Sequence, residues 1–583
     1  MERDHRMRMI QNPVLQGFSP DPSVVRVGDT YYVATSTFEW FPGVRIYRTK
    51  DLEHYEQLPS PLVRESQLHM EGNPDSCGVW APDLSWDGER FWLVFTDVKT
   101  RGTADYFNTH NYIVWTYDIM GEWSEPVYLN SAGFDPSLFH DTDGRSYLVN
   151  MINGFKGIRV QEFDKETKKL TGPAKNVCAG TGRGFTEGPH IYHIGEWYYL
   201  MMAEGGTSYE HCEVLCRSRD LWGGYEEDPG NPILTSNRED RNALQKCGHA
   251  DLVQTQSGEW YLFHLCARPD ERGVCVLGRE TAVQKVFWNE DGWLRLSAGG
   301  RYGRMTAEAP VGYGDCDGLT TGGPAGSWKD GTEGADKGTG EEPSAEKYAD
   351  RTGGFEEEFD RPVLDPSFST LRVPPEKVLS LTARKGWLRL YGHEFLTSCF
   401  RTSLLARKQS CRKSRMECGM EFSPRSEQQG AGAAYFYDTH NFYLLILTKD
   451  GSGSDVLRFL RCRSGAVEVL AEQPLSGDGE ADGTWKEVPD ASWEETPDGS
   501  ERYGQGRMLH LRIETDKSGE QAVFSWSRDG QTYIKVAEAD TEILTDEHCV
   551  GFTGAHFGVY CHDMADQSDH ADFKYFRVLE DRG

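Results

Sequence analysis

Three acidic residues stand in segments that would hold a carboxylate on a rigid turn beside apolar strands. Asp21 and Asp135 share the tripeptide D-P-S, in F-S-P-D-P-S and F-D-P-S respectively. The proline after each aspartate fixes the backbone and removes a competing donor. Glu187 lies in G-F-T-E-G-P-H, where its neighbours give it little side-chain cover. Carboxylates presented in this way suit general acid and base catalysis, whereas for each one alone the capping of a turn is the alternative.

Sequence signatures of several other enzyme classes are missing. The chain has no H-E-x-x-H, no G-x-S-x-G and no P-loop, and the G-T-G-R-G that starts at Gly180 follows no Rossmann unit. Zinc peptidases, serine hydrolases and nucleotide-dependent enzymes are therefore disfavoured. Phe38, Trp40 and Trp80 offer aromatic faces of the kind on which sugar rings stack, although such aromatics taken alone are more often part of a core. Together these features favour acid–base chemistry by carboxylates on a neutral substrate.

The charge and the chain start restrict the partners and the compartment. With 62 basic and 92 acidic residues, the net charge of -30 repels nucleic acid and anionic lipid. The start, M-E-R-D-H-R-M-R-M-I, is followed by no apolar segment, and no 18-residue apolar run occurs. The 14 cysteines are scattered without a C-x-x-C pair, which is typical of reduced thiols. We therefore expect a cytoplasmic protein with no membrane segment and no nucleic-acid partner.

The elements that must position the carboxylates repeat along the first half of the chain. A polar residue, a short apolar strand, a turn with glycine or aspartate and an aromatic-rich strand recur in that order. The copies begin at Asp21, Asp83, Asp135, His190 and Asp251, in steps of 62, 52, 55 and 61 residues. Each copy has the composition and turn chemistry of a β-hairpin.

Five hairpin-centred units at this spacing predict a five-bladed β-propeller with about four short strands per blade. A β-sandwich with chance similarity among its hairpins is the alternative. In a propeller, the polar residues that open the copies converge on the central axis, so Asp21, Asp83, Asp135, Asp251 and the region of Glu187 would share one face. Clustered carboxylates repel one another, and like charge raises the pKa of some of them. A functional site is therefore expected on this face.

The composition changes after the last copy. Eleven of residues 313–354 are glycine and apolar runs are almost absent, which predicts a flexible linker or insertion. Alternating strands return afterwards, for example N-F-Y-L-L-I-L from Asn441 and M-L-H-L-R-I from Met508. The expected organisation is all-β: a propeller over residues 1–312, the linker or insertion, and a β-sandwich over residues 355–583.

Several segments resemble glycoside hydrolase family 43, in its β-xylosidase branch. In the propeller they are F-S-P-D-P-S (18–23), S-T-F-E-W-F-P-G-V (36–44), G-N-P-D-S-C-G-V-W-A-P (72–82), F-D-P-S-L-F-H-D (134–141), T-E-G-P-H-I-Y (186–192), G-H-A-D (248–251) and L-G-R-E-T-A (277–282). The resemblance continues at F-D-R-P-V-L-D-P-S-F-S-T-L-R (359–372) and G-F-T-G-A (551–555). The resemblance implies the five-bladed propeller that the repeats suggest, followed by a lectin-like β-sandwich of jelly-roll type.

The resemblance also implies roles for individual residues. Asp21 matches the general base, Glu187 the general acid, and Asp135 the third carboxylate, which tunes the pKa of the acid and orients the sugar. The remaining matches concern substrate binding, with Phe38 and Trp80 as pocket walls, Arg279 as a hydroxyl-binding arginine and His249 as an axial histidine. In some relatives that histidine holds a calcium ion, so a structural calcium is expected near His249, while catalysis needs no cofactor.

Two departures from the family pattern bear on specificity. The usual C-P-L-G-R reads C-V-L-G-R at 275–279, and G-A-F-V-G reads G-A-H-F-G at 554–558, so His556 is expected in place of a phenylalanine at the leaving-group subsite. The resemblance implies an inverting exo-glycosidase that releases xylose from β-1,4-xylo-oligosaccharides, as a homodimer or homotetramer. An α-L-arabinofuranosidase, or an enzyme with both activities, uses the same three acids and stays open. A non-catalytic carbohydrate-binding propeller would lack one of them.

Overall fold

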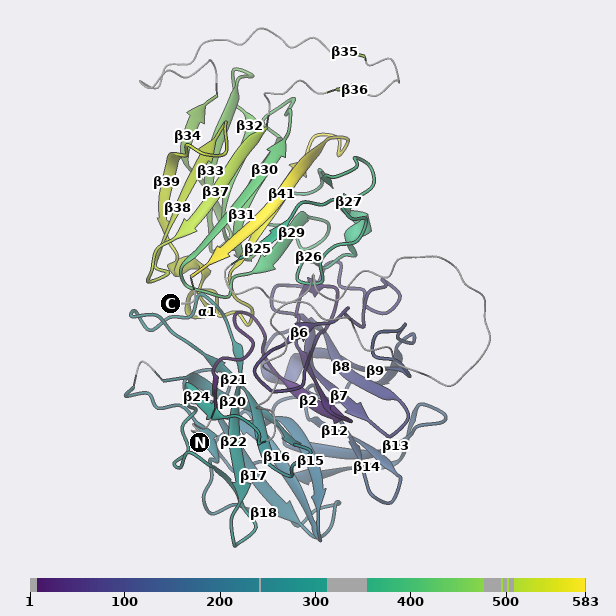
Figure 1. The fold of residues 1–583 in the computed structure, drawn as a ribbon. Coiled ribbons are helices and arrows are strands. Elements are labelled where there is room, and N and C mark those ends of the chain that lie inside the picture. Colours follow the sequence, from purple (N-terminus) through teal and green to yellow (C-terminus); the bar gives the residue numbers. More distant parts are fainter. Residues whose placement is uncertain are drawn as a thin grey trace, which may run out of the picture.

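A computed structural model describes residues 8–240, 243–311, 354–475, 494–495, 501–502 and 508–581, and nearly all of its elements are strands (Figure 1). Strands between residues 9 and 308 build the lower half of the view, and strands between 355 and 580 build the upper half. The all-β expectation is confirmed. The predicted linker over 313–354 lies outside the described residues except for its last glycine.

The lower half is a propeller of five antiparallel blades, as the repeats predict. Their strands, in blade order, are β2 (Ser23–Val27), β3 (Thr30–Thr35), β5 (Arg45–Thr49) and β6 (Glu56–Gln57); β7 (Gly78–Trp86), β8 (Phe91–Thr100), β9 (Asn108–Thr116) and β10 (Val127–Asn130); β11 (Ser137–His140), β12 (Ser146–Met151), β13 (Ile158–Asp164) and β14 (Lys169–Cys178); β15 (Glu187–Ile194), β16 (Trp197–Glu204), β17 (Cys212–Ser218), β18 (Glu226–Glu227) and β19 (Leu234–Thr235); β20 (Gln245–Gln254), β21 (Trp260–Ala267), β22 (Glu280–Trp288) and β23 (Leu294–Leu296). Each of the five predicted hairpins forms the first two strands of a blade.

The ring closes through the start of the described chain. Strand β1 (Met9–Gln11) pairs antiparallel with β24 (Thr306–Glu308), which follows the fifth blade. The Asn12 side chain then bonds the backbone of the fifth blade in both directions, donating to the Val283 carbonyl at 2.7 Å and accepting from the Val283 amide at 2.9 Å. Closure thus satisfies polar groups that an open edge would leave unpaired.

The upper half is a sandwich of two antiparallel sheets. One contains β27 (Leu379–Ser380), β28 (Leu388–Tyr391), β41 (His570–Glu580), β30 (Ser414–Glu421), β37 (Leu509–Thr515), β38 (Gln521–Ser527) and β39 (Ile534–Asp540), with β25 (Phe355–Glu357) beside β41. The other contains β34 (Ala466–Pro474), β33 (Asp455–Arg463), β32 (Asn441–Lys449), β31 (Gln429–Asp438), β40 (His556–Asp563), β29 (Ser403–Lys408) and β26 (Ser369–Leu371). Alternating inward side chains such as Leu511, Ile513, Leu445 and Phe557 fill the space between them.

The two halves share a sheet and a core. Strand β4 (Trp40–Phe41), from the connection between β3 and β5 of the first blade, leaves the propeller and pairs with β26 as the edge of the second sandwich sheet. One buried apolar cluster includes propeller residues such as Phe38 and Trp80 together with sandwich residues such as Phe436 and Tyr560. Such a shared core holds the two domains in one orientation, because separating them would expose it.

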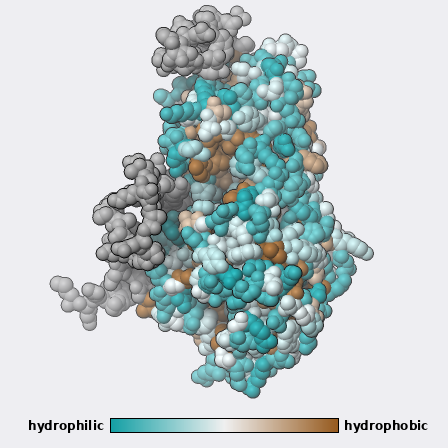
Figure 2. All heavy atoms as spheres, turned by 90° about the vertical axis from the view of Figure 1, so that its right-hand side faces the viewer, coloured by the Kyte–Doolittle hydropathy of each residue, from teal (hydrophilic) through white to brown (hydrophobic). Residues whose placement is uncertain are grey.

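The face shown in Figure 2 is mainly hydrophilic, with hydrophobic residues gathered in separate patches. No helix among the residues that the structure describes is long and apolar enough to cross a membrane.

Candidate active site

The three carboxylates predicted from sequence lie where the first strands of three blades begin. Asp21 and Asp135 each come two residues before such a strand, β2 and β11, and Glu187 is the first residue of β15. Asp21 and Asp135 have left-handed backbones, with φ of 55° and 49°. This conformation is uncommon for residues other than glycine, and strain of this kind concentrates at functional sites. The paired D-P-S motifs thus mark two unusual turns that aim their carboxylates at the propeller axis.

Asp21 is a buried carboxylate surrounded by donors. The Ser36 hydroxyl donates to its Oδ2 at 2.6 Å, and Arg279 donates to its Oδ1 at 3.1 Å. Burial acts to raise the pKa of Asp21, but the Arg279 charge, His249 and the Ser36 bond together lower it below its usual value. Asp21 is therefore ionised at neutral pH, as a general base must be.

The pKa values of Glu187 and Asp135 are shifted upward, in the direction opposite to that of Asp21. Burial raises the pKa of both carboxyls, and charge repulsion within the cluster raises each further. The pKa of Asp135 rises to about 8, although its Oδ2 accepts a bond from the Gly188 amide at 3.1 Å. Glu187 Oε1 is buried without a hydrogen-bond partner among the described residues, and the Arg279 charge offsets the raised pKa only in part. A protonated Glu187 beside an ionised Asp21 is the arrangement that an acid–base pair needs.

His211 faces the Glu187 carboxyl, and the sequence analysis did not single it out. Its Nδ1 lies 3.0 Å from the Lys246 carbonyl, which can only accept, so Nδ1 carries the proton and Nε2 offers a lone pair. Nε2 is buried without a hydrogen-bond partner 3.9 Å from Glu187 Oε1. Burial lowers the pKa of His211 to about 3. The imidazole is thus neutral and adds no positive charge that would favour the Glu187 carboxylate.

Aromatic rings wall the space beside these carboxyls. The ring centroids of Phe38 and Trp80 lie 5.8 Å apart, and the Arg279 guanidinium lies 5.2 Å from the Phe38 centroid. Phe38 also has a left-handed backbone, with φ of 52°. The Trp80 indole N–H donates to the Ser76 carbonyl at 3.0 Å, which fixes the ring plane. The residues predicted as pocket walls are therefore assembled in one place.

The sandwich completes this wall with Phe552. Its ring centroid lies 5.9 Å from that of Phe38 and 5.6 Å from that of Trp80. Its carbonyl accepts from the Arg279 Nη2 at 3.0 Å, and its amide donates to the Ser76 hydroxyl at 3.1 Å. One sandwich residue thus contacts the aromatic walls and orients the arginine that bonds Asp21, so the site needs both domains.

His556 has a different place from the one expected. Its side chain is fully buried, stacked on Trp40 with ring centroids 4.1 Å apart, and its Nδ1 donates to the Gly554 carbonyl at 2.8 Å. It presents no surface to a ligand in this structure. The sandwich residue beside the pocket is Phe552, four positions earlier, and the G-A-H-F-G departure falls on the contact between the domains.

His249 lies beside Asp21. Its Nδ1 is 3.8 Å from Asp21 Oδ1, and burial lowers the pKa of the imidazole to about 4. The ring packs against Gly188, where a Cβ would lie 2.9 Å from it. The residue after Glu187 must therefore be small, and in this chain it is a glycine.

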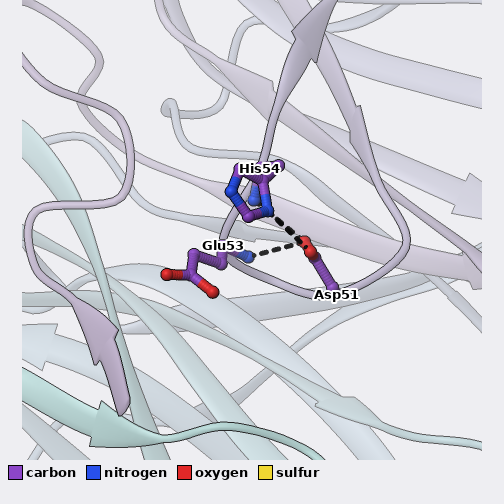
Figure 3. Close-up of side chains that lie close together, drawn as sticks. All are labelled: Asp51, Glu53 and His54. Carbon is purple, nitrogen blue, oxygen red and sulfur yellow. Dashed lines mark hydrogen bonds and ion pairs between the residues drawn. The ribbon is translucent and has the colours of Figure 1, made fainter. Parts of the chain in front are cut away.

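The clusters of side chains that could hold a cation do not include His249 among the described residues. Four groups of acidic and histidine side chains are close enough to hold a cation, and none contains His249. The buried group on the axis is Asp83, His190 and Asp251, but the carboxylate oxygens there already accept bonds from Ser23, Tyr192 and backbone amides. The exposed group of Asp51, Glu53 and His54 is a hydrogen-bonded turn after β5 (Figure 3).

Comparison with known proteins places the chain among carbohydrate-active enzymes. Residues 10–294 match the glycosyl hydrolases family 43, and residues 356–579 match the β-xylosidase C-terminal concanavalin A-like domain. A β-xylosidase of Bacillus subtilis is 40% identical, covering 98% of this chain and 99% of the relative. A xylosidase/arabinosidase 43B of Humicola insolens is 39% identical, with coverages of 98% and 97%. The crystal structure of a xylan β-1,4-xylosidase from Bacillus halodurans superposes with a TM-score of 0.83, at 39% identity and coverages of 98% and 100%.

Proposed function

Because the chain belongs to glycosyl hydrolases family 43, we propose that it releases xylose from the non-reducing ends of β-1,4-xylo-oligosaccharides. The observation that carries this proposal is the pair of buried carboxyls with opposite pKa shifts, lowered at Asp21 and raised at Glu187. Two carboxyls whose environments separate their pKa values are the usual basis of glycoside hydrolysis.

In the proposed reaction, Asp21 removes a proton from a water molecule that attacks the anomeric carbon. Glu187 gives its proton to the glycosidic oxygen as the bond to the leaving sugar breaks. Burial keeps the pKa of Glu187 high, and the charge of Asp135 raises it further whenever that carboxyl is ionised. Asp135 accepts a hydrogen bond from the Gly188 amide next to Glu187. Because the attacking atom belongs to water and not to Asp21, the configuration at the anomeric carbon inverts.

Contacts between the two domains at the site support exo-action. Phe552 crosses from the sandwich to Phe38 and Trp80, and the Arg279 guanidinium lies 5.2 Å from the centroids of both Phe38 and Phe552. A pocket walled by both domains suits a chain end, whereas internal cleavage needs a groove that is open at two sides. Neutral aromatic faces with one buried arginine also suit an uncharged sugar bearing several hydroxyls.

The test is a comparison of four substrates on the purified full chain. We expect xylobiose to be cleaved faster than polymeric xylan, with xylose as the first product. Mid-chain cuts, or faster release of sugar from the polymer, would contradict the exo assignment. Rates on 4-nitrophenyl β-D-xylopyranoside and on the α-L-arabinofuranoside separate the two specificities, and we expect the xyloside to be preferred.

A second candidate activity is removal of α-L-arabinofuranosyl ends. The observation that favours it is the 39% identity to the Humicola insolens relative, whose name includes both activities. The same acid and base would serve both substrates, so the two activities can coexist in one pocket. An arabinofuranoside rate equal to or above the xyloside rate would make this the main function.

We also propose that the enzyme works in the cytoplasm as a dimer or tetramer. None of the thirteen described cysteines forms a disulfide bond, and ten of them are buried. A reducing compartment keeps such thiols free. Fractionation of cells that produce the protein, and its mass in solution by light scattering, test the two statements separately.

A further inference from the structure

The segment that leads into Glu187 is rich in glycine. Residues 180–184 read G-T-G-R-G and belong neither to a P-loop nor to a Rossmann unit. Gly180, Gly182 and Gly184 all have positive φ, between 82° and 90°. Such a segment does not hold the following side chains in one place by itself, because glycine has more accessible backbone conformations than other residues. A contact from elsewhere in the fold is therefore needed to fix Glu187.

Glu204, the last residue of β16, supplies this contact. Its side chain is fully buried, and its Oε1 accepts two hydrogen bonds, from the Thr181 amide at 2.7 Å and from the Thr186 hydroxyl at 2.8 Å. The Thr181 hydroxyl donates to Oε2 of the same carboxyl. Thr181 and Thr186 lie near the two ends of the glycine-rich segment, so a single side chain closes the segment into a loop.

The first glycine of the segment makes room for this closure. A Cβ at Gly180 would lie 2.2 Å from Thr186 Oγ1 and 2.5 Å from Glu204 Oε1. A side chain at this position would therefore push the hydroxyl and the carboxyl apart. The backbone adds a further contact, because the Gly205 amide donates to the Gly184 carbonyl at 2.8 Å. The G-T-G-R-G motif is thus explained by packing of the loop against the end of β16.

Thr186 passes the constraint on to Glu187. The two residues are neighbours in the chain, and Glu187 pairs with Ala203 in the ladder between β15 and β16. Ala203 in turn directly precedes Glu204. The strand pairing and the bond between Thr186 and Glu204 therefore hold the backbone of Glu187 from two sides.

We infer that Glu204 is a positioning residue for the general acid, because it holds Thr181 and Thr186 and thereby places the Glu187 carboxyl. This inference rests on the proposed function, in which Glu187 is the acid. A general acid must come within hydrogen-bond distance of the atom that it protonates. A misplacement of about 1 Å can lower the rate about 10²-fold. The loss of Glu204 should therefore matter most for a substrate whose leaving oxygen needs a proton.

The experiment compares kcat/KM for xylobiose and for 4-nitrophenyl β-D-xylopyranoside in Glu204→Ala and Glu204→Gln. We expect Glu204→Ala to lower the xylobiose value about 10- to 100-fold and the aryl xyloside value less than about threefold, because nitrophenolate leaves without a proton. Glu204→Gln should stay within about threefold of the wild type on both substrates, since an amide oxygen can accept both bonds that Oε1 accepts. The Thr181 hydroxyl can then accept from the amide nitrogen in place of donating to Oε2.

Asp228→Ala is the matched control. Asp228 is another buried acidic residue of the fourth blade, and its carboxyl accepts from a loop amide, that of Gly230, at 2.7 Å. We expect this variant to lower the melting temperature without separating the two substrates. Thr186→Val and Thr186→Ser test the same contact with Glu204 intact. Only the valine variant, which lacks the hydroxyl, should lower the xylobiose value.

Equal losses on both substrates in Glu204→Ala would overturn the inference, because they would mean that Glu204 supports the fold as a whole and not the acid. An unchanged xylobiose value would overturn it as well. If Glu204→Ala does not fold, the two Thr186 variants decide the question by the same comparison of substrates. Failure of the proposed function looks different, since the wild-type protein would then cleave neither substrate.

Discussion

We expect Arg279 to set the pH below which Asp21, the proposed base, becomes protonated and activity is lost. Its guanidinium donates to Asp21 at 3.1 Å, and both side chains are almost fully buried. A charge pair about 4 Å apart at an effective dielectric constant of about 20 is worth roughly 4 kcal/mol, or about three pKa units. Opposite charges at this range lower a carboxyl pKa by about one to three units. Removal of the arginine charge should therefore raise the pKa of Asp21 by that amount.

The sign of the effect on activity follows from the role of Asp21. The base works only when ionised, so activity is lost as the pH falls through its pKa. In Arg279→Ala, the acidic limb of kcat/KM should move to higher pH by about one to three units. The substrate is 4-nitrophenyl β-D-xylopyranoside, whose leaving group needs little protonation, so the limb reports the base and not Glu187.

Arg279→Lys is the matched control for this prediction. A lysine keeps the positive charge near Asp21 but cannot reproduce the two-sided contact with the Phe552 carbonyl. We expect its KM to rise while its acidic limb stays close to that of the wild type. If the limb of Arg279→Ala does not move, the arginine charge does not set the pKa of Asp21 and the reasoning is wrong.

Three further predictions concern the acid, the sandwich wall and the domain contact. Glu187→Ala should lower the rate on xylobiose by about 10²–10⁴-fold and spare the aryl xyloside much more, because only the poor leaving group needs the proton; equal losses in steady-state kinetics would refute its role as the acid. Phe552→Ala should lower kcat/KM for the aryl xyloside about five- to tenfold through one lost aromatic contact, and an unchanged value would show that the sandwich does not form the pocket. Gly278→Ala should cost more stability than Gly88→Ala in urea unfolding, because both glycines have positive φ but only at Gly278 would a Cβ meet another backbone atom, 1.9 Å from the Thr553 carbonyl oxygen. The strained backbone alone is worth about 1–3 kcal/mol, so equal losses in the two variants would contradict the close approach.

Local chemistry explains why the propeller could be predicted from sequence. The residues that specify each hairpin lie within about 15 consecutive positions. In D-P-S-L-F-H-D-T-D-G-R-S-Y-L-V, for example, the turn closes between Asp141 and Gly144. The spacing of such units then limits the topology. Asp21, Asp135 and Glu187 could be found for the same reason, since their unusual turns need proline or glycine neighbours.

The missing parts of the site depend on contacts between distant residues. Phe552 bonds Ser76 across more than 470 positions, and β4 pairs with β26 from another domain. Neither contact leaves a periodic pattern in the sequence. His211 is recognisable only once the Lys246 carbonyl and the Glu187 carboxyl are placed around it. For His556 the motif was misleading. The motif resembles a pocket segment of the family, whereas the side chain is buried and stacked on Trp40.

The central claim is that Asp21 acts through a water molecule and Glu187 supplies the proton. Proton NMR of the first minutes of xylobiose cleavage tests it most directly, because the anomeric signals distinguish the two forms of xylose before they interconvert. If water attacks the anomeric carbon, α-xylose appears first at the cleaved end. If β-xylose appears first, a covalent intermediate forms on a carboxylate and Asp21 does not act through water.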